Sequence, residues 1–369
     1  MRGTRRGVTG ALGIMLAAST LALTPAAPAG AVPPTLPAPN ANGITLQSLT
    51  EVGGDPRMLD ATVRTSAIFT PQPGATPSID PVVQPVRVRI LLPADYQSNP
   101  TRRYPVLYLL HGGADDYESW SKTGKGNVAS IVDASPFRGI VVMPEAGKAG
   151  WYSDWVGSTD GHFRPLWETF HVRQLVGWID ANFPTVASRS GRTVAGVSMG
   201  GYGALRYAGR FPDVFSGVGV FSGGTNIREP GAQSIVNDSM WFYGAAFYWT
   251  GLFDGTFRVT GSTQQRMETV FGPASGWGAV NPYDLAGAYD AYDGEMALYS
   301  GNSGSDAGIG TWNTAFHGRL AAAGVDHRFC IGTGDHSWGY WRGDLRDFLA
   351  HRYGTTPSSC PNGWGAPQP

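Results

Sequence analysis

The stretch that decides the fold is TVAGVSMGGYGALRYAGRFP, residues 193–212. Its β-branched start predicts a buried strand through Ala195, and the segment from Tyr202 to Phe211 has helical character until Pro212. Between them lies the pattern Gly-x-Ser-x-Gly centred on Ser198. Glycines flank the serine because such a turn is strained and no side chain fits beside it. The pattern alone arises by chance in a chain with 52 glycines, but its place between strand and helix indicates a nucleophile elbow.

Further strands are predicted on both sides of this stretch. The helical pattern of Phe170 to Asn182 carries apolar residues at helical spacing and ends before Pro184. Strands followed by crossover helices predict one mainly parallel sheet with helices on both faces, the α/β-hydrolase fold. The other predicted strands are Pro85–Leu92, Pro105–Leu110, Gly139–Met143, Met296–Ser300 and Arg328–Ile331.

A serine hydroxyl is a weak nucleophile near neutral pH, so Ser198 needs a base within hydrogen-bond reach. His336 is preferred because it follows the predicted strand 328–331 in the glycine-rich loop GTGDHSWGYW. Five other histidines, on helices or polar edges, are interpreted as surface or packing residues. They are His162, His171, His317, His327 and His351.

The base in turn needs a carboxylate that orients it, expected in a loop after the strand 296–300. Asp306 lies there, and the chain order Ser198, Asp306, His336 is the nucleophile, acid, base order of this fold. Asp335 is disfavoured because neighbours in sequence usually point apart. The other competing acids are Asp284, Asp290, Asp293 and Glu295.

Two backbone N–H groups should stabilise a tetrahedral oxyanion at Ser198. One is expected from Met199, directly after the serine. The second is expected from Gly113, in the turn His111-Gly112-Gly113-Ala114 that follows a predicted strand. We also expect His111 and Gly112 to contact substrate.

Composition limits the classes of ligand. The chain has 369 residues and a formal net charge of −1, so no basic stripe suggests a nucleic-acid partner. No histidine pairs with another histidine or an acid at convincing metal-ligand spacing, and we predict neither a metal nor a cofactor. The sequence makes no prediction of oligomeric state.

The two ends of the chain differ in character from its middle. Arg2, Arg5 and Arg6 precede an apolar run, and the small residues Ala29-Gly30-Ala31 follow it. This pattern predicts a cleaved signal peptide over residues 1–31, with an uncleaved anchor as the alternative, and hence a secreted or wall-associated protein without stable membrane insertion. A Pro-rich linker (32–43), one catalytic domain (44–353) and a tail (354–369) are expected to follow. An oxidising compartment favours a disulfide between Cys330 and Cys360.

Several strings resemble the esterase D superfamily, and within it the antigen 85 mycolyltransferases and their actinobacterial esterase relatives. They are VVMP (141–144), WYSDW (151–155), WETF (167–170), the serine turn and HSWGYW (336–341). In this family the acid stands seven residues before an Asn-x-x-Phe string, which Asn313 to Phe316 matches, so the resemblance also implies Asp306. It implies an α/β-hydrolase that takes ester or acyl-lipid substrates, which we expect Trp155 and Trp338 to contact.

Departures from the mycolyltransferases shape the expected activity. Their Asp-Gly-Leu-Arg turn is replaced here by residues 111–114, HGGA, so the acid and arginine associated with sugar binding are absent. We therefore expect a secreted serine carboxylesterase, with acyl transfer to a sugar or lipid alcohol as the alternative. A third interpretation, a non-catalytic wall-binding protein, is disfavoured because all three triad positions are filled.

The segment from Ser222 to Arg266 concentrates aromatic residues and shows no obvious strand. We predict a helical lid or acyl-pocket wall over Ser198, because aromatic side chains offer large apolar contact areas. Ordinary core packing of two helices is the competing interpretation. Trp241 and Trp249 are the residues of this segment expected to contact substrate.

Overall fold

The computed structural model describes residues 34–68, 70–71, 86–157, 163–242 and 263–368. All of them belong to one compact unit, Val32–Pro369. Residues 1–33, which include the predicted signal peptide, lie outside the described residues. In the described ranges, no helix is both long and apolar enough to cross a lipid bilayer.

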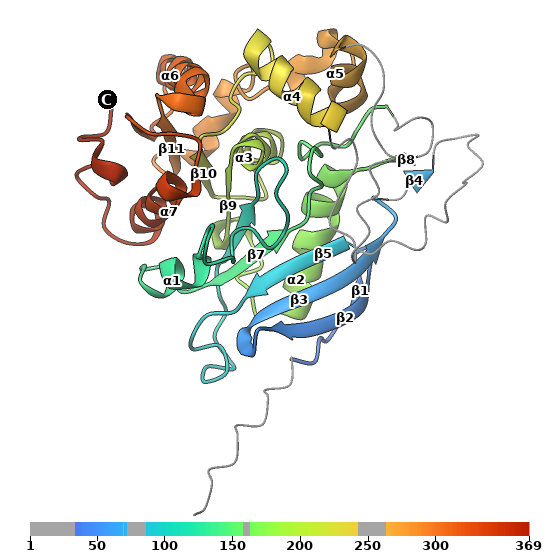
Figure 1. The fold of residues 1–369 in the computed structure, drawn as a ribbon. Coiled ribbons are helices and arrows are strands. Elements are labelled where there is room, and N and C mark those ends of the chain that lie inside the picture. The colour runs from blue at the N-terminus through green and yellow to red at the C-terminus, as the bar shows by residue number, and fades with distance from the viewer. Residues whose placement is uncertain (1–33, 69, 72–85, 158–162, 243–262, 369) are drawn as a thin grey trace, which may run out of the picture. The chain divides into compact units, whose positions relative to one another are not determined.

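Ten strands of the described chain form one sheet in the order β1-β2-β3-β5-β7-β6-β9-β10-β11-β12 (Figure 1). From β7 to β12 all neighbours in this order are parallel, and from β1 to β7 all are antiparallel. The predicted mainly parallel sheet is thus confirmed. The strand bounds are β1 Asn40–Ala41, β2 Ile44–Val52, β3 Asp55–Thr65, β5 Val86–Leu91, β6 Val106–Leu110, β7 Ile140–Pro144, β9 Arg192–Val197, β10 Gly217–Phe221, β11 Met296–Gly301 and β12 Arg328–Gly332, with β4 Thr70–Pro71 and β8 Phe163–Arg164 as a separate pair.

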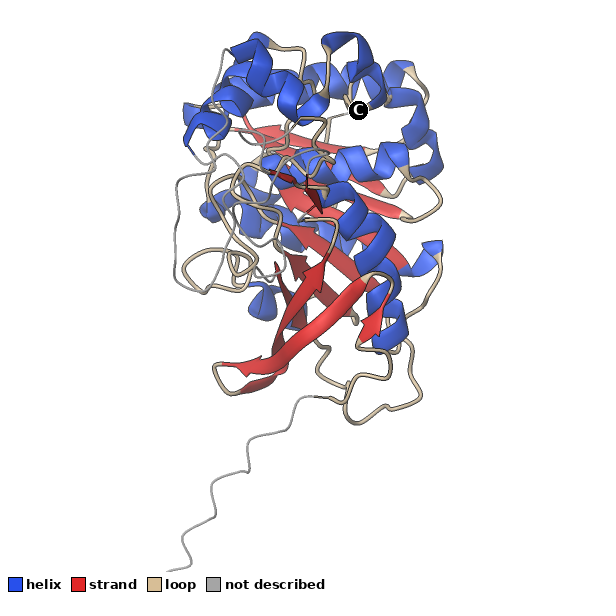
Figure 2. Ribbon diagram, turned by 90° about the vertical axis from the view of Figure 1, so that its right-hand side faces the viewer, coloured by secondary structure: helices blue, strands red, loops and turns tan. Residues whose placement is uncertain are grey.

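Helices cover both faces of the sheet, as predicted (Figure 2). In β6, Val106, Tyr108 and Leu110 face one apolar layer, whereas Leu107 and Leu109 face the other. Both sets are buried because a parallel strand is covered on each side. The first layer contains α2 (Val176–Asn182), α3 (Met199–Arg210) and α6 (Ala307–Ala322), and the second contains α1 (Val128–Asp133) and α7 (Trp338–Tyr353).

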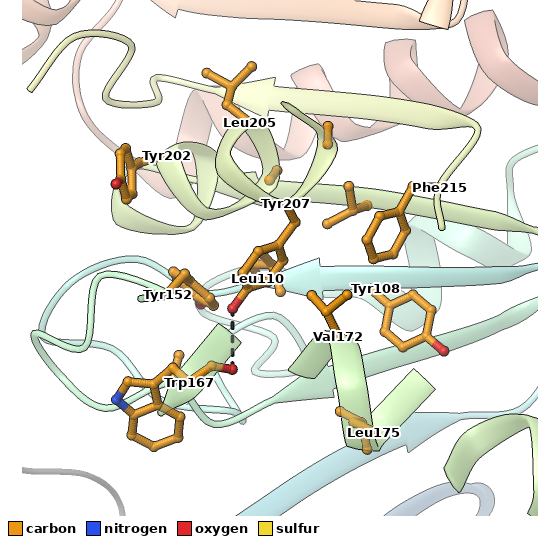
Figure 3. Packing of buried hydrophobic residues seen from close by; sticks show 14 of the residues in the cluster. Tyr108, Leu110, Tyr152, Trp167, Val172, Leu175, Tyr202, Leu205, Tyr207 and Phe215 are labelled. Atoms are coloured by element: carbon orange, nitrogen blue, oxygen red, sulfur yellow. Dashed lines mark hydrogen bonds between the residues drawn. The ribbon is translucent and has the colours of Figure 1, made fainter. Parts of the chain in front are cut away.

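In the first layer, α3 packs against the predicted helix 170–182. That helix consists of a π-helical segment, η1 (Thr169–Leu175), which runs directly into α2. Figure 3 shows Tyr207 of α3 close to Leu110, with its hydroxyl 3.5 Å from the carbonyl oxygen of Trp167. The same hydroxyl lies 2.8 Å from Nδ1 of His171, whose burial lowers the pKa of its imidazole to about 3. His171 is therefore a neutral packing residue, as its helical position indicated.

The remaining helices complete the described chain. Two of them, α4 and α5, pack against each other in the segment predicted to form a lid. Residues 243–262 between them, which include Trp249, lie outside the described residues. The bounds are α4 Pro230–Phe242, α5 Thr263–Phe271, η2 Arg189–Gly191, η3 Ala274–Ala279, η4 Ala286–Tyr292, η5 Gly304–Asp306 and η6 Pro361–Gly363.

The C-terminal tail is fastened to the last strand of the sheet. Cys330 and Cys360 form the predicted disulfide, with their Cα atoms 5.6 Å apart. Near the end of the chain, the amide of Gln368 donates to the carbonyl of Phe329 at 2.8 Å, an antiparallel bridge to β12. Figure 1 shows this segment, in red, beside α7.

Candidate active site

Ser198 occupies a strained turn between β9 and α3. Its backbone has φ 54° and ψ −118°, a conformation that residues with a side chain rarely adopt. The flanking glycines are required by close packing: a Cβ on Gly196 would lie 2.4 Å from the Gly200 carbonyl oxygen, and one on Gly200 would lie 2.5 Å from that of Leu110. The turn therefore lifts the partly exposed Ser198 side chain out of the core.

His336 and Asp306 complete a hydrogen-bonded series with Ser198. Nε2 of His336 lies 2.9 Å from the Ser198 hydroxyl oxygen, and Nδ1 lies 2.6 Å from Oδ1 of Asp306. The three residues follow β9, β12 and β11, whose carboxyl ends meet at one edge of the parallel sheet. Asp306 is fully buried and His336 partly exposed. The structure thus brings together the three residues chosen from the sequence.

The second oxygen of Asp306 has its own partners. Oδ2 accepts hydrogen bonds from the Ser222 hydroxyl at 2.7 Å and from the Gly301 amide at 3.1 Å. The Ser222 oxygen in turn accepts one from the Trp341 indole at 3.0 Å. With a positive φ of 47°, Ser222 directs its hydroxyl to the carboxylate from the end of β10. This role was not predicted from the sequence, where the only signal is that Ser222 directly follows an apolar pentapeptide.

The competing acids all lie in other environments. Asp335 is exposed, and it accepts hydrogen bonds from the amides of Ser305 and His336 at 3.0 and 2.8 Å. The hydrogen bond from the Ser305 hydroxyl is the main reason that the pKa of Asp335 is lowered. The others are bonded to arginines, accept a backbone amide or are exposed: Asp284 with Arg228, Glu295 with Arg352, Asp293 with the Asp326 amide, and Asp290 on the surface.

The turn that contains Gly113 lies against the serine turn. A Cβ on Gly112 would lie 3.5 Å from the Ser198 Cβ, and one on Gly113 would lie 4.0 Å from the Met199 Cβ. As the first residue of α3, Met199 has an amide without an acceptor inside the helix, and the helix dipole adds positive potential there. The two predicted amides are therefore on adjacent segments beside Ser198.

The loop from Glu145 to Tyr152 holds the turn of residues 111–114 in place. The Ala114 amide donates to the Lys148 carbonyl at 2.8 Å, and the Tyr152 hydroxyl donates to the His111 carbonyl at 2.9 Å. The Glu145 carboxyl is fully buried, and burial raises its pKa to about 8. It accepts a hydrogen bond from the Gly147 amide at 2.9 Å, within the same loop.

Two side chains expected to contact substrate are instead buried. The His111 ring is 1% exposed and bonds to the Ala146 amide and the Gly112 carbonyl, at 3.0 and 2.8 Å. The Trp155 ring is also 1% exposed, with its indole N–H on the Gly150 carbonyl. This corrects the expectation for both, because their rings are buried and their polar atoms bond within the protein.

A cavity of about 30 Å³ opens beside Ser198. Trp151 lines it and is held to α4 by an indole hydrogen bond to the Ser239 hydroxyl at 3.0 Å. Ile235 of α4 also lines it and is 44% exposed. The cavity walls are mainly apolar, formed by Trp151, Met199, Tyr202, Ser222, Gly224, Asn226, Ile227, Ala232, Ile235, Val236, Ile309 and Trp312.

Two further tryptophans expected at the substrate, Trp338 and Trp241, lie outside this lining. Trp338 packs edge-on against Trp120 and Trp341, with ring centroids 4.9 and 5.2 Å away. Trp241 is 47% exposed at the end of α4, with the Arg266 guanidinium 5.3 Å from its ring centroid. Trp249 lies outside the described residues. Among described residues, no three His, Cys, Asp or Glu side chains gather as a metal site would need.

Comparison with known proteins agrees with this geometry. Residues 82–351 match a protein family described as "Putative esterase". An esterase of Mycobacterium tuberculosis, esterase Rv1288, is 36% identical over 222 residues, which cover 60% of this chain and 42% of that protein. The chain therefore spans less than half of that longer relative. The diacylglycerol acyltransferase/mycolyltransferase Ag85A of Mycobacterium ulcerans is 28% identical over 69% of this chain and 76% of its own.

A solved structure shares the fold. The S-formylglutathione hydrolase of Agrobacterium tumefaciens superposes with a TM-score of 0.58 and 14% identity, over 84% of this chain and 99% of that one. At this identity the likeness concerns the fold alone. The family match, by contrast, covers seven of the ten sheet strands, from β5 to β12, and includes Ser198, Asp306 and His336. The chain belongs to this esterase family.

Proposed function

We propose that this protein is a serine carboxylesterase that forms an acyl-enzyme at Ser198. The observation that carries the proposal is the hydrogen-bonded series Ser198, His336, Asp306, with contacts of 2.9 and 2.6 Å at a strained turn. A structural role explains this series poorly, because it places a partly exposed hydroxyl on an imidazole backed by a buried carboxylate.

Each group has a defined part in the reaction. Nε2 of His336 takes the Ser198 proton as the serine oxygen attacks the ester carbonyl, and the amides of Met199 and Gly113 stabilise the oxyanion. His336 then protonates the leaving alkoxide, which departs as the alcohol. Water, deprotonated by the same imidazole, releases the acid and restores the serine. Asp306 keeps Nδ1 protonated, so that Nε2 is free to accept.

The acyl group is proposed to enter the cavity beside Ser198. Its mainly apolar walls suit a hydrocarbon group. Truncation of Trp151 or Ile235 to alanine should shift the preference among p-nitrophenyl esters toward longer acyl chains. Trp241, exposed and outside the lining, provides the comparison: Trp241→Ala should leave the preference unchanged if the cavity, rather than the end of α4, selects the acyl group.

The direct test is hydrolysis of p-nitrophenyl acetate and butyrate by the wild type and by Ser198→Ala. Wild-type turnover with a loss of at least about 10³-fold in the variant is expected. Ser98→Ala is the control, because Ser98 is exposed and its hydroxyl bonds only to its own loop, to the Asp95 carbonyl at 3.1 Å and the Asn99 side-chain amide at 3.3 Å. Equal turnover by wild type and Ser198→Ala would overturn the proposal.

Acyl transfer is the second candidate, favoured by the alignment with Ag85A over 76% of that protein. The first half of the reaction is the same, and an alcohol replaces water in the second half. Incubation with a short-chain ester and trehalose, followed by mass spectrometry, separates the two. Free acid alone supports hydrolysis, whereas acylated trehalose supports transfer.

We also propose that the protein works outside the cytoplasm. A disulfide persists in an oxidising compartment, and the basic and apolar start of the sequence is typical of an export signal. Edman sequencing of protein from a secreting host would test this. A mature start near Val32 is expected, and intact Met1 in the medium would contradict cleavage.

A further inference from the structure

The C-terminal tail lies directly against the loop that carries His336. We define residues 332–337, from the last residue of β12 to the start of α7, as the histidine loop. The Trp364 indole donates to the Thr333 carbonyl at 3.0 Å. A Cβ on Gly332 would lie 2.2 Å from Trp364 Cδ1, and one on Gly334 would lie 2.9 Å from its Cζ2. The ring therefore contacts the backbone of three consecutive residues at the start of the loop.

The opposite side of the histidine loop is bonded to the segment that carries Asp306. The Gly334 carbonyl accepts from the Ser303 amide and hydroxyl at 3.1 and 2.7 Å. The Asn302 amide donates to the Gly332 carbonyl at 3.0 Å. Movement of Gly334 away from Ser303 would draw His336, two residues later, away from Asp306. The Trp364 indole blocks that movement because it lies on the side of Gly334 opposite to Ser303.

Trp364 is itself held at several points. The Cys330–Cys360 disulfide anchors the tail four residues earlier, and Tyr340 of α7 stacks on the indole at 17° with centroids 6.1 Å apart. The Asn362 side-chain amide donates to the buried carboxyl of Asp344 at 2.8 Å. These contacts hold Trp364 between β12, α7 and the histidine loop.

We infer that Trp364 is a positioning residue for His336, which acts by pressing the histidine loop against the Asp306 segment. It touches no reacting atom. Its effect is on the placement of Nε2 relative to the Ser198 hydroxyl, and small misplacements of catalytic groups cost much rate. The inference rests on the proposed function of Ser198 and His336.

The test compares Trp364→Ala and Trp364→Phe in the full chain with its disulfide intact. We expect Trp364→Ala to lower kcat for p-nitrophenyl butyrate by roughly 10- to 100-fold, with KM within about two-fold of wild type. Trp364→Phe keeps a ring against Gly332 and Gly334 and should restore most of kcat. Active sites are counted by fluorophosphonate labelling, so that kcat refers to competent molecules.

Trp277→Ala is the matched control. Its indole also donates to a backbone carbonyl, that of Gly272 at 2.9 Å, but it contacts neither the tail nor the histidine loop. We expect this variant to lower the melting temperature and to keep the wild-type kcat per labelled site. A general loss of stability would instead lower the number of labelled sites in both variants and leave kcat per labelled site unchanged.

The outcomes are distinct. A folded Trp364→Ala protein with wild-type kcat overturns the inference, as does an equal fall of kcat in Trp277→Ala. If Trp364→Ala does not fold, Trp364→Leu takes its place, and a wild-type kcat there overturns the inference equally. Absence of labelling in the wild type would instead overturn the proposed function.

Discussion

Asp306 shows how one residue's surroundings set the chemistry of another. Its Oδ2 accepts two hydrogen bonds, from Ser222 and Gly301, which leaves Oδ1 for Nδ1 of His336. An asparagine here would keep its carbonyl oxygen on those two donors and turn its amide group toward His336. The imidazole would then carry its proton on Nε2, where it cannot accept one from Ser198.

We therefore expect Asp306→Asn to lower kcat by a factor on the order of 10⁴, the scale seen for this change in another serine enzyme, with little change in melting temperature. Steady-state kinetics and thermal unfolding of the same preparation check both parts. A variant within ten-fold of the wild-type kcat would contradict the assigned role.

Besides lining the cavity, Ser222 should act on catalysis through Asp306. Without its hydroxyl, Oδ2 keeps only the Gly301 amide, and the Trp341 indole loses its acceptor. Loss of a hydrogen bond to a charged group costs roughly 1.5–3 kcal/mol, so Ser222→Ala should lower kcat by about ten-fold or more. Ser300→Ala is the control, since its buried hydroxyl donates to the Gly301 carbonyl and not to Asp306. Equal kcat values for both variants would count against this role.

Glu145 makes stability depend on pH. Its pKa is about 8 in the folded protein, because of burial, against an ordinary value of 4.5. Between these values the unfolded chain has lost the proton and the folded one still holds it, so the stability present below pH 4.5 is lost progressively up to about pH 8.

Glu145→Gln removes this pH dependence. As pH rises through this window, the free energy of unfolding of the wild type should fall relative to that of the variant by up to about 1.4 kcal/mol per pH unit. Urea unfolding at pH 5, 6, 7 and 8 measures this difference. A constant difference would show that Glu145 ionises normally.

At the scale of elements, α3 must approach β6 closely to place both turns. A Cβ on Gly200 would lie 2.5 and 2.6 Å from the Leu110 and His111 carbonyl oxygens. Gly200→Ala should therefore displace the turn of residues 111–114, lowering both stability and kcat. Gly318→Ala is the opposite case: in α6, with no atom within 4 Å of the added Cβ, it should raise the free energy of unfolding by roughly 0.5–1 kcal/mol. Circular dichroism melts of both variants test the pair, and a stabilising Gly200→Ala would refute the packing argument.

The elements also show where sequence patterns are informative. β6, β7, β9, β11 and β12 are short apolar runs, and each was predicted within about two residues. β3 was missed because it contains the charged residue Asp60. This charge is tolerated in the core because Arg89, opposite it on the neighbouring strand β5, forms an ion pair with it at 2.7 Å. β10 was missed because its alternating glycines, at Gly217 and Gly219, give little β signal.

At the scale of the whole molecule, the distance in sequence between contacting residues decides which parts of the site could be predicted. Ser198, Asp306 and His336 come from loops after strands, so local patterns and chain order were sufficient to select them. Contacts between residues distant in the sequence, such as Ser222 with Asp306 and Trp364 with the histidine loop, join positions 84 and 31 residues apart and leave no local pattern. For His111 and Trp155 the error had the same origin, because sequence position near the site does not reveal which way a side chain points.

The central claim is that Ser198 is a nucleophile activated by His336. Its most direct measurement is labelling of the full-length protein by a fluorophosphonate, followed by peptide mass spectrometry. We predict one adduct per chain, located on Ser198, absent in Ser198→Ala and strongly slowed in His336→Ala. A folded wild-type protein that is not labelled, or is labelled at another serine, would contradict the account.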